Sequence, residues 1–198
     1  MFEVVKKCGN ARVGKLITKT GEYETPFFMP VATKGAAKYI TPESLEEMGV
    51  RNIISNSFIM YLRPGVDLVK KHGGIHKFMN WKYCSFTDSG GFQILSLNDF
   101  KGGFSDEGLR FKSPFDGTKH LLSPENVIKI EEDIGADVIM AIDQMPVCGE
   151  VREEVILATN RTHKWAEECL RVHKKNGQLL FGICQGGIFE DLRRESAK

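Results

Sequence analysis

The sequence predicts an α/β protein with a parallel β-sheet, because one combination of helix start and buried strand occurs twice. Thr41-Pro42-Glu43 precedes a short helical segment and then the strand-like run 52–56, and Ser123-Pro124-Glu125 precedes a longer helical segment and then the run 138–143. Thr and Ser cap helices, Pro fits the first turn, and an acid is favourable at the positive end of the helix dipole. Repeated units of helix and buried strand are typical of parallel sheets.

The remaining elements follow from hydrophobic periodicity and turn residues. Five parallel strands are expected, near residues 27–31, 52–56, 84–88, 138–143 and 180–185. Further helices are expected after Pro64 and over residues 151–175. Residues 2–28 alternate as antiparallel strands do, and residues 109–122 indicate a hairpin inserted into the α/β scaffold. A closed (β/α) barrel has about eight strands, so this pattern stops about three strands short.

Composition indicates one globular unit with a sizeable core. The chain has 198 residues, 41% of them hydrophobic, and nothing in it marks an internal domain boundary. Its 27 Lys and Arg balance 26 Asp and Glu, which argues against a broad basic surface for nucleic acid. No apolar run has the length of a membrane span or a signal peptide, so we expect no membrane partner.

The five cysteines are odd in number and are not closely paired. The apolar neighbours of Cys84 and Cys184 favour buried thiols in both cases. Unpaired thiols of this kind are typical of a reducing compartment, and we therefore expect a cytoplasmic protein.

Three polar side chains follow buried strands at the point where each strand ends. They are Asp88, Asp143 and Gln185, which come after the runs CSFT, VIMAI and FGIC. Each one alone could cap the next turn or helix. Three at equivalent positions favour a site, because catalytic residues collect at the carboxyl ends of barrel strands.

The residues around these positions suit a flat heterocycle. Gly90-Gly91 and Gly186-Gly187 allow close approach to the backbone, although tight turns would use them equally well. Phe92 is either a stacking platform for a base or a core residue. Carboxylates accept hydrogen bonds from ring N–H and amino groups, and a carboxamide both donates and accepts. The predicted ligand is therefore purine-like and not a phosphate, which would call for Lys or Arg.

Other histidines offer weaker patterns. His72 and His76 have a metal-like spacing, but two glycines lie between them and no acidic or Cys ligand accompanies them, so a solvated turn is the favoured interpretation. His163 and His173 lie in a charged helical segment and are expected on its solvated face.

Taken together, several motifs resemble the tRNA-guanine transglycosylase family. In chain order they are FFMPV (27–31), YLRPG (61–65), TDSGGFQ (87–93), FKSPFDGTKHLLSPE (111–125), GADVIMAID (135–143) and FGICQGG (181–187). They occur in the family's order and cover nearly the whole chain from about residue 10 onward.

The resemblance implies a (β/α)8 TIM-type barrel, of which residues 1–198 form an incomplete N-terminal part, with about the first five strands. It implies an enzyme that replaces guanine in tRNA with a 7-deazaguanine through a covalent enzyme–RNA intermediate. By the same resemblance, Asp88 is the catalytic acid/base. The expected base-binding residues are Ser89, Phe92, Asp143, Gln185 and Gly186.

The resemblance also implies that some functional groups of the family lie outside these 198 residues. Family members carry the nucleophilic aspartate and the Zn²⁺ ligands beyond the QGG motif, so we expect no metal ligand among these 198 residues and no activity from them alone. Gln144-Met145 departs from the residues usual after this aspartate, which leaves the preferred base open. The expected partners are tRNA, guanine or a 7-deazaguanine, and a second subunit in a homodimer or in a heterodimer with a related barrel.

Two alternatives of other classes remain. The chain could be a short, non-catalytic relative that binds a base or assists a catalytic subunit, because the nucleophile and zinc ligands are missing from it. It could also be an unrelated barrel enzyme acting on a small molecule, since fold alone does not define function.

Overall fold

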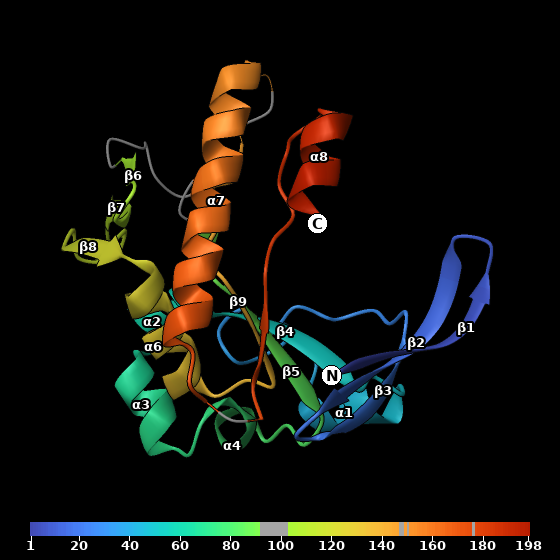
Figure 1. The fold of residues 1–198 in the computed structure, drawn as a ribbon. Coiled ribbons are helices and arrows are strands. Elements are labelled where there is room, and N and C mark those ends of the chain that lie inside the picture. Colours follow the sequence, from blue (N-terminus) through green and yellow to red (C-terminus); the bar gives the residue numbers. More distant parts are fainter. Residues whose placement is uncertain (92–102, 147–148, 150, 176) are drawn as a thin grey trace. The chain divides into compact units, whose positions relative to one another are not determined.

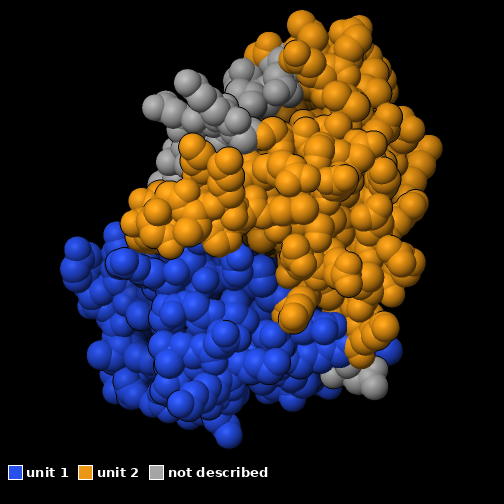
Figure 2. Space-filling view, turned by 90° about the vertical axis from the view of Figure 1, so that its left-hand side faces the viewer, with its two compact units in different colours: residues 1–88, 130–139, 175–179 blue, residues 89–129, 140–174, 180–198 orange. Residues whose placement is uncertain are grey.

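The computed structural model describes residues 1–91, 103–146, 149, 151–175 and 177–198. These residues form two compact units, each assembled from separate stretches of the chain (Figure 2). Unit 1 contains residues 1–88, 130–139 and 175–179, and unit 2 contains residues 89–129, 140–174 and 180–198. The expectation that residues 1–198 belong to one incomplete barrel domain stays a prediction.

The N-terminal segment of unit 1 is an antiparallel sheet, as its alternation predicts (Figure 1). It consists of β1 (Phe2–Cys8), β2 (Ala11–Thr18) and β3 (Gly21–Thr25). Leu16 of β2 and Tyr23 of β3 are cross-strand partners and are both buried. Because side chains alternate between the two faces of a strand, this pair marks the face that packs inward.

The parallel strands form a sheet of order β10-β9-β5-β4. Their bounds are β4 (Asn52–Asn56), β5 (Cys84–Asp88), β9 (Val138–Met140) and β10 (Leu179–Phe181). Strands β4 and β5 match their predicted ranges, whereas β9 and β10 end earlier than expected. The prediction that Asp143 and Gln185 stand at strand ends is therefore wrong, because they lie three residues beyond β9 and four residues beyond β10. The register pairs Asn52 with Cys84 and Asn56 with Asp88, so the last residues of β4 and β5 lie side by side.

The predicted strand at 27–31 is wrong. Only Val31 forms a bridge, parallel to Ile54 of β4. Pro26 precedes this segment and Pro30 lies within it, and proline has no N–H to donate to a sheet. The carbonyl of Pro30 still accepts from the Ile54 N–H at 3.1 Å, so the segment runs beside β4 without becoming a strand.

Both predicted helix starts are confirmed. The Thr41 hydroxyl accepts from the N–H of Ser44 at 3.2 Å and caps α1 (Pro42–Glu47). The Ser123 hydroxyl accepts from the N–H of Asn126 at 3.2 Å and caps α6 (Pro124–Ile134) in the same way. Each hydroxyl satisfies an amide that has no partner inside its helix.

Two further helices agree with the sequence prediction, α3 (Val66–Lys71) and α7 (Arg152–Val172). Three more helices were not expected, namely α2 (Ser57–Leu62), α4 (Ile75–Met79) and α8 (Glu190–Ser196). Helix α2 follows β4 directly, and its residues 57–60 are all buried. A helix that is apolar and buried on every side shows no 3.6-residue periodicity, so its sequence reads as a continuation of the strand.

The predicted hairpin is present in unit 2, where β7 (Gly108–Lys112) pairs antiparallel with β8 (Lys119–Leu122). A short strand, β6 (Phe104–Ser105), extends this sheet on the other side of β7. The side chain of Asp116 accepts from the N–H of Thr118 at 3.1 Å, which is the local bond that makes Asp favourable in a turn.

The predictions that Cys84 and Cys184 are buried have different outcomes. Cys84 is completely buried on β5, where burial raises the pKa of its thiol. Cys184 is exposed, and its predicted burial is wrong, because β10 ends at Phe181 and the following residues leave the sheet. Among the residues that the structure describes, no helix is long and apolar enough to cross a membrane.

Candidate functional site

Asp88 ends β5 in unit 1, and the neighbouring strand orients its side chain. Asn56 is its register partner on β4, and Asn56 Nδ2 donates to Asp88 Oδ1 at 2.6 Å. Asn56 Oδ1 accepts from the N–H of Ile59 at 2.7 Å and thereby caps α2. Both ends of the Asn56 amide are therefore occupied, and one side chain couples the start of α2 to the Asp88 carboxylate.

The backbone of Asp88 is also held. The Ser57 hydroxyl donates to the Asp88 carbonyl oxygen at 2.7 Å. The Thr87 hydroxyl contacts Glu131 Oε2 of α6 in a very short hydrogen bond. Thr87 and Glu131 are fully buried, and Asp88 is partly buried. Burial raises the pKa of Glu131 to about 8, and the negative charge of Asp88 adds to this increase.

Asp143 and Gln185 lie together in unit 2. Gln185 Nε2 donates to Asp143 Oδ2 at 2.5 Å. Burial raises the pKa of Asp143 to about 6, while the hydrogen bond from Gln185 opposes the increase. A Cβ atom at Gly91 would lie 3.0 Å from Asp143 Oδ1, so glycine at this position leaves room for the carboxylate. The structure therefore brings together two of the predicted base-binding residues.

The backbone of Gln185 is supported by residues that sequence reasoning missed. Its N–H donates to Ser196 Oγ of α8 at 2.9 Å. Ser196 Oγ also lies 2.7 Å from His163 Nε2 of α7. His163 is consequently half-buried, and the prediction that it faces solvent is wrong. His173 is also half-buried, against the same prediction. No local pattern links residues 163, 185 and 196, because only the packing of α7 and α8 brings them together.

The residue after Asp143 is held by α7. The backbone N–H of Gln144 donates to Thr162 Oγ1 at 3.0 Å, and its side-chain Oε1 accepts from Arg161 Nη1 at 2.5 Å. Arg161 also pairs with Asp106 at 3.1 Å. The unusual residue at position 144 is thus a fixed part of unit 2.

The other predicted base-binding residues have different outcomes. Ser89 is buried in unit 2, and Phe92 lies outside the described residues. Gly186 has φ +115°, and a Cβ there would lie 2.5 Å from Arg193 N of α8. The chain's own packing therefore requires glycine at position 186, whatever its role toward a ligand.

The described residues do not fit a zinc site. No group of three or more His, Cys, Asp or Glu within the ranges that the structure describes could hold a metal ion. The pattern at His72 and His76 has another explanation. His76 Nδ1 donates to the Trp81 carbonyl at 2.9 Å, and its Nε2 lies 3.0 Å from Asp137 Oδ2, an ion-pair distance without hydrogen-bond geometry.

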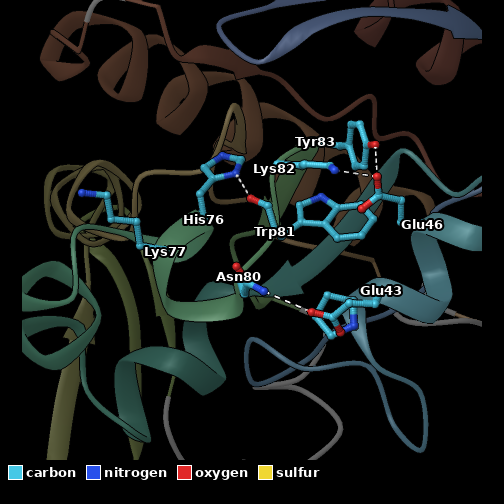
Figure 3. Close-up of a pocket in the computed structure, with 9 residues that line it drawn as sticks. Glu43, Glu46, His76, Lys77, Asn80, Trp81, Lys82 and Tyr83 are labelled. Atoms are coloured by element: carbon cyan, nitrogen blue, oxygen red, sulfur yellow. Dashed lines mark hydrogen bonds and ion pairs between the residues drawn. The ribbon is translucent and has the colours of Figure 1, made fainter.

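Unit 1 also contains a polar pocket with a volume of about 430 Å³ (Figure 3). Its lining comes from α1, α4 and the residues that precede β5, so it lies at the opposite end of β5 from Asp88. Glu46 accepts from Lys82 and from Tyr83, both at 2.6 Å, and Glu43 accepts from Asn80 at 3.1 Å. The polar side chains that line the pocket bind one another. We therefore interpret these bonds as structural contacts between α1 and the residues that precede β5.

Comparison with known proteins gives one family. The family described as "Queuine tRNA-ribosyltransferase" matches residues 7–198. A queuine tRNA-ribosyltransferase of Desulforamulus reducens is 50% identical over 197 residues, which are 100% of this chain and 53% of that protein. One from Halalkalibacterium halodurans is 46% identical, over 100% of this chain and 52% of that protein. One from Thermotoga petrophila is 47% identical, over 99% of this chain and 53% of that protein. The chain spans about half the length of the curated relatives it matches.

Proposed function

Because this chain belongs to the queuine tRNA-ribosyltransferase family, we propose that it provides the base-reading part of an enzyme that exchanges guanine in tRNA for a 7-deazaguanine. The chain spans about half of its relatives, so the activity is proposed for the protein as its gene encodes it. In keeping with the family, we propose a TIM-type barrel that acts in the cytoplasm as a dimer.

The observation that carries the proposal is the pair formed by Asp143 and Gln185. Guanine and 7-deazaguanines present N–H and amino donors beside a carbonyl acceptor. An ionised Asp143 accepts from the donors, and the Gln185 amide has both an acceptor and a second donor hydrogen left after its bond to Asp143. Their 2.5 Å contact orients both groups before a base arrives. Such a site discriminates strongly, because an unsuitable base leaves its partly buried polar groups unpaired.

Asp88 is proposed to manage the proton of the leaving and entering bases. In retaining glycosyl transfer, a carboxylate attacks the anomeric carbon as the bond to the leaving base breaks, and the new base then displaces that carboxylate. A separate group must supply a proton to the departing base and take one from the incoming base. Asn56 and Ser57 hold Asp88 at its carboxylate and at its backbone, which suits a group that must act at one fixed position.

The test is exchange of isotope-labelled guanine into tRNA by the protein as its gene encodes it. We expect Asp143→Asn to reduce exchange by roughly 100-fold and Asp88→Asn by at least that much, since each removes a charged partner from a preorganised site. Asp67→Asn is the matched control, because Asp67 is an exposed aspartate on α3. Equal activity in all three variants would disprove the residue assignments, and no exchange by the unmodified protein with any tRNA would disprove the function.

A further inference from the structure

Glu131 is a buried carboxyl group directly beneath the end of β5. Its side chain has no exposed surface, and its Oε2 contacts the Thr87 hydroxyl. Its other oxygen, Oε1, has no hydrogen-bond partner among the described residues. No cation compensates this carboxyl within the part of the chain that the structure describes, because the one charge acting on it is that of Asp88, which is also negative. An ionised carboxylate in such a place is strongly disfavoured.

The neighbouring hydroxyls supply Glu131 with one hydrogen. The Thr87 hydroxyl donates to Glu131 Oε2, whereas the hydroxyl hydrogen of Ser57 is donated to the Asp88 carbonyl oxygen at 2.7 Å. A buried carboxylate with a single hydrogen-bond donor among the described residues is strongly disfavoured, which supports the neutral form of Glu131.

We propose that Glu131, in its protonated form, is a positioning residue that holds the end of β5, and through it Asp88, by way of the Thr87 hydroxyl. This proposal rests on the proposed role of Asp88 in base exchange. Thr87 immediately precedes Asp88, and the Ser57 hydroxyl donates to the Asp88 carbonyl oxygen, so Glu131 holds the chain directly before Asp88 and Ser57 holds the backbone of Asp88 itself. Helix α6 thereby reaches the functional end of a strand that it does not adjoin in sequence.

The groups facing Glu131 decide how it responds to pH. β5 presents Thr87 and the carboxylate of Asp88, α2 presents Ser57, and Gln178 Nε2 donates to the Glu131 backbone carbonyl at 3.4 Å. Burial and the Asp88 charge keep the pKa of Glu131 at about 8, so the proton is held at neutral pH and lost in mildly alkaline solution. Ionisation of Glu131 would add a second negative charge beside that of Asp88. The repulsion between the two carboxylates would displace the end of β5.

The test compares Glu131→Gln, Glu131→Ala and the control Glu125→Gln in the protein as its gene encodes it. Glutamine has the shape of the protonated acid and cannot ionise, and Glu125 is an exposed glutamate on the same helix. At about pH 7 we expect Glu131→Gln to retain kcat within about twofold, and Glu131→Ala to lose about tenfold in kcat with KM for tRNA nearly unchanged. Between about pH 7 and pH 9.5, the unmodified protein and Glu125→Gln should lose about tenfold more activity than Glu131→Gln, because only Glu131→Gln has no proton to release there.

A second measurement separates this proposal from the function on which it rests. Amide hydrogen exchange of the peptide containing Thr87 and Asp88, corrected for the intrinsic effect of pH, should accelerate above about pH 8 in the unmodified protein and not in Glu131→Gln. That result supports the positioning role even if the unmodified protein exchanges no base, whereas an identical pH profile in both proteins overturns it. If Glu131→Ala does not fold, the comparison of glutamate with glutamine still decides between these outcomes.

Discussion

Each unit holds one candidate aspartate through a carboxamide side chain, and the two carboxamides leave different capacity for binding a ligand. In unit 1 the Asn56 amide donates to Asp88 at 2.6 Å, and in unit 2 the Gln185 amide donates to Asp143 at 2.5 Å. Asn56 also uses its oxygen to cap α2, whereas no hydrogen bond to Gln185 Oε1 occurs among the described residues. The Asn56 amide is therefore bound by the protein at both of its ends, whereas the Gln185 amide retains an oxygen that can accept from a ligand. This difference fits the proposed roles of Asp88 as a fixed reacting group and of Asp143 and Gln185 as a base-reading pair.

The largest expected effect concerns Glu131, the buried carboxyl group whose pKa is raised in part by the charge of Asp88 in unit 1. Its pKa is about 8 in the folded protein and near the ordinary value of 4.5 when unfolded. Between these values the folded state holds a proton that the unfolded state lacks, so stability falls as pH rises, by about 1.4 kcal/mol per unit and on the order of 4 kcal/mol in total. We expect Glu131→Gln to remove this slope in denaturant unfolding measured from about pH 5 to pH 9, with Glu125→Gln unchanged.

The next largest effect concerns base recognition by Asp143. We expect Asp143→Asn to weaken binding of guanine by roughly 100-fold at neutral pH, because the amide presents a donor where the base requires an acceptor. The pKa of Asp143 is about 6, so the carboxylate is mostly ionised at neutral pH and becomes protonated as pH falls through 6. Affinity of the unmodified protein should therefore decline by about tenfold per unit below that pH, as measured by calorimetry. A flat profile from about pH 7 to pH 5 would contradict this role.

The two carboxamides should differ when each is truncated. Asn56→Ala removes a helix cap and a partner of a carboxylate, and we expect it to lower the free energy of unfolding by about 2 kcal/mol. Gln185→Ala should cost less than about 1 kcal/mol in stability and act mainly on base affinity, since its amide is not fully used by the fold. Denaturant unfolding and base titration of both variants measure the two effects. Equal losses of stability would mean that Gln185 is as structural as Asn56.

The smallest expected effects come from the two helix caps, which begin equivalent elements. Thr41→Ala and Ser123→Ala each remove a hydroxyl that accepts from a backbone N–H at 3.2 Å. We expect each to cost about 1 kcal/mol of stability and to leave base affinity unchanged. Thermal unfolding of both variants checks this.

Sequence reasoning succeeded where the information is local. The caps at Thr41 and Ser123, the turn at Asp116 and the ends of β4 and β5 follow from short-range bonds and from apolar runs of strand length. It failed at α2, because a helix that is buried on all sides shows no helical periodicity in its sequence. It also failed at residues 27–31, where two prolines lack the N–H groups needed for full strand pairing. It also failed at Cys184, because an apolar neighbourhood in sequence does not define depth in the fold.

The sequence by itself determined the family, the α/β class and the place of Asp88 at the end of β5, because motifs and strand periodicity depend on residues that are adjacent in the chain. It did not determine where β9 and β10 end relative to Asp143 and Gln185. Only the tertiary structure decided which groups surround those positions. Asn56 meets Asp88 through parallel register, Glu131 reaches Thr87 from a helix 44 residues away in sequence, and Ser196 reaches Gln185 from α8. The physical reason is that hydrogen bonding and burial act through space, so the proton on Glu131 and the elevated pKa of Asp143 arise only when distant segments pack around them.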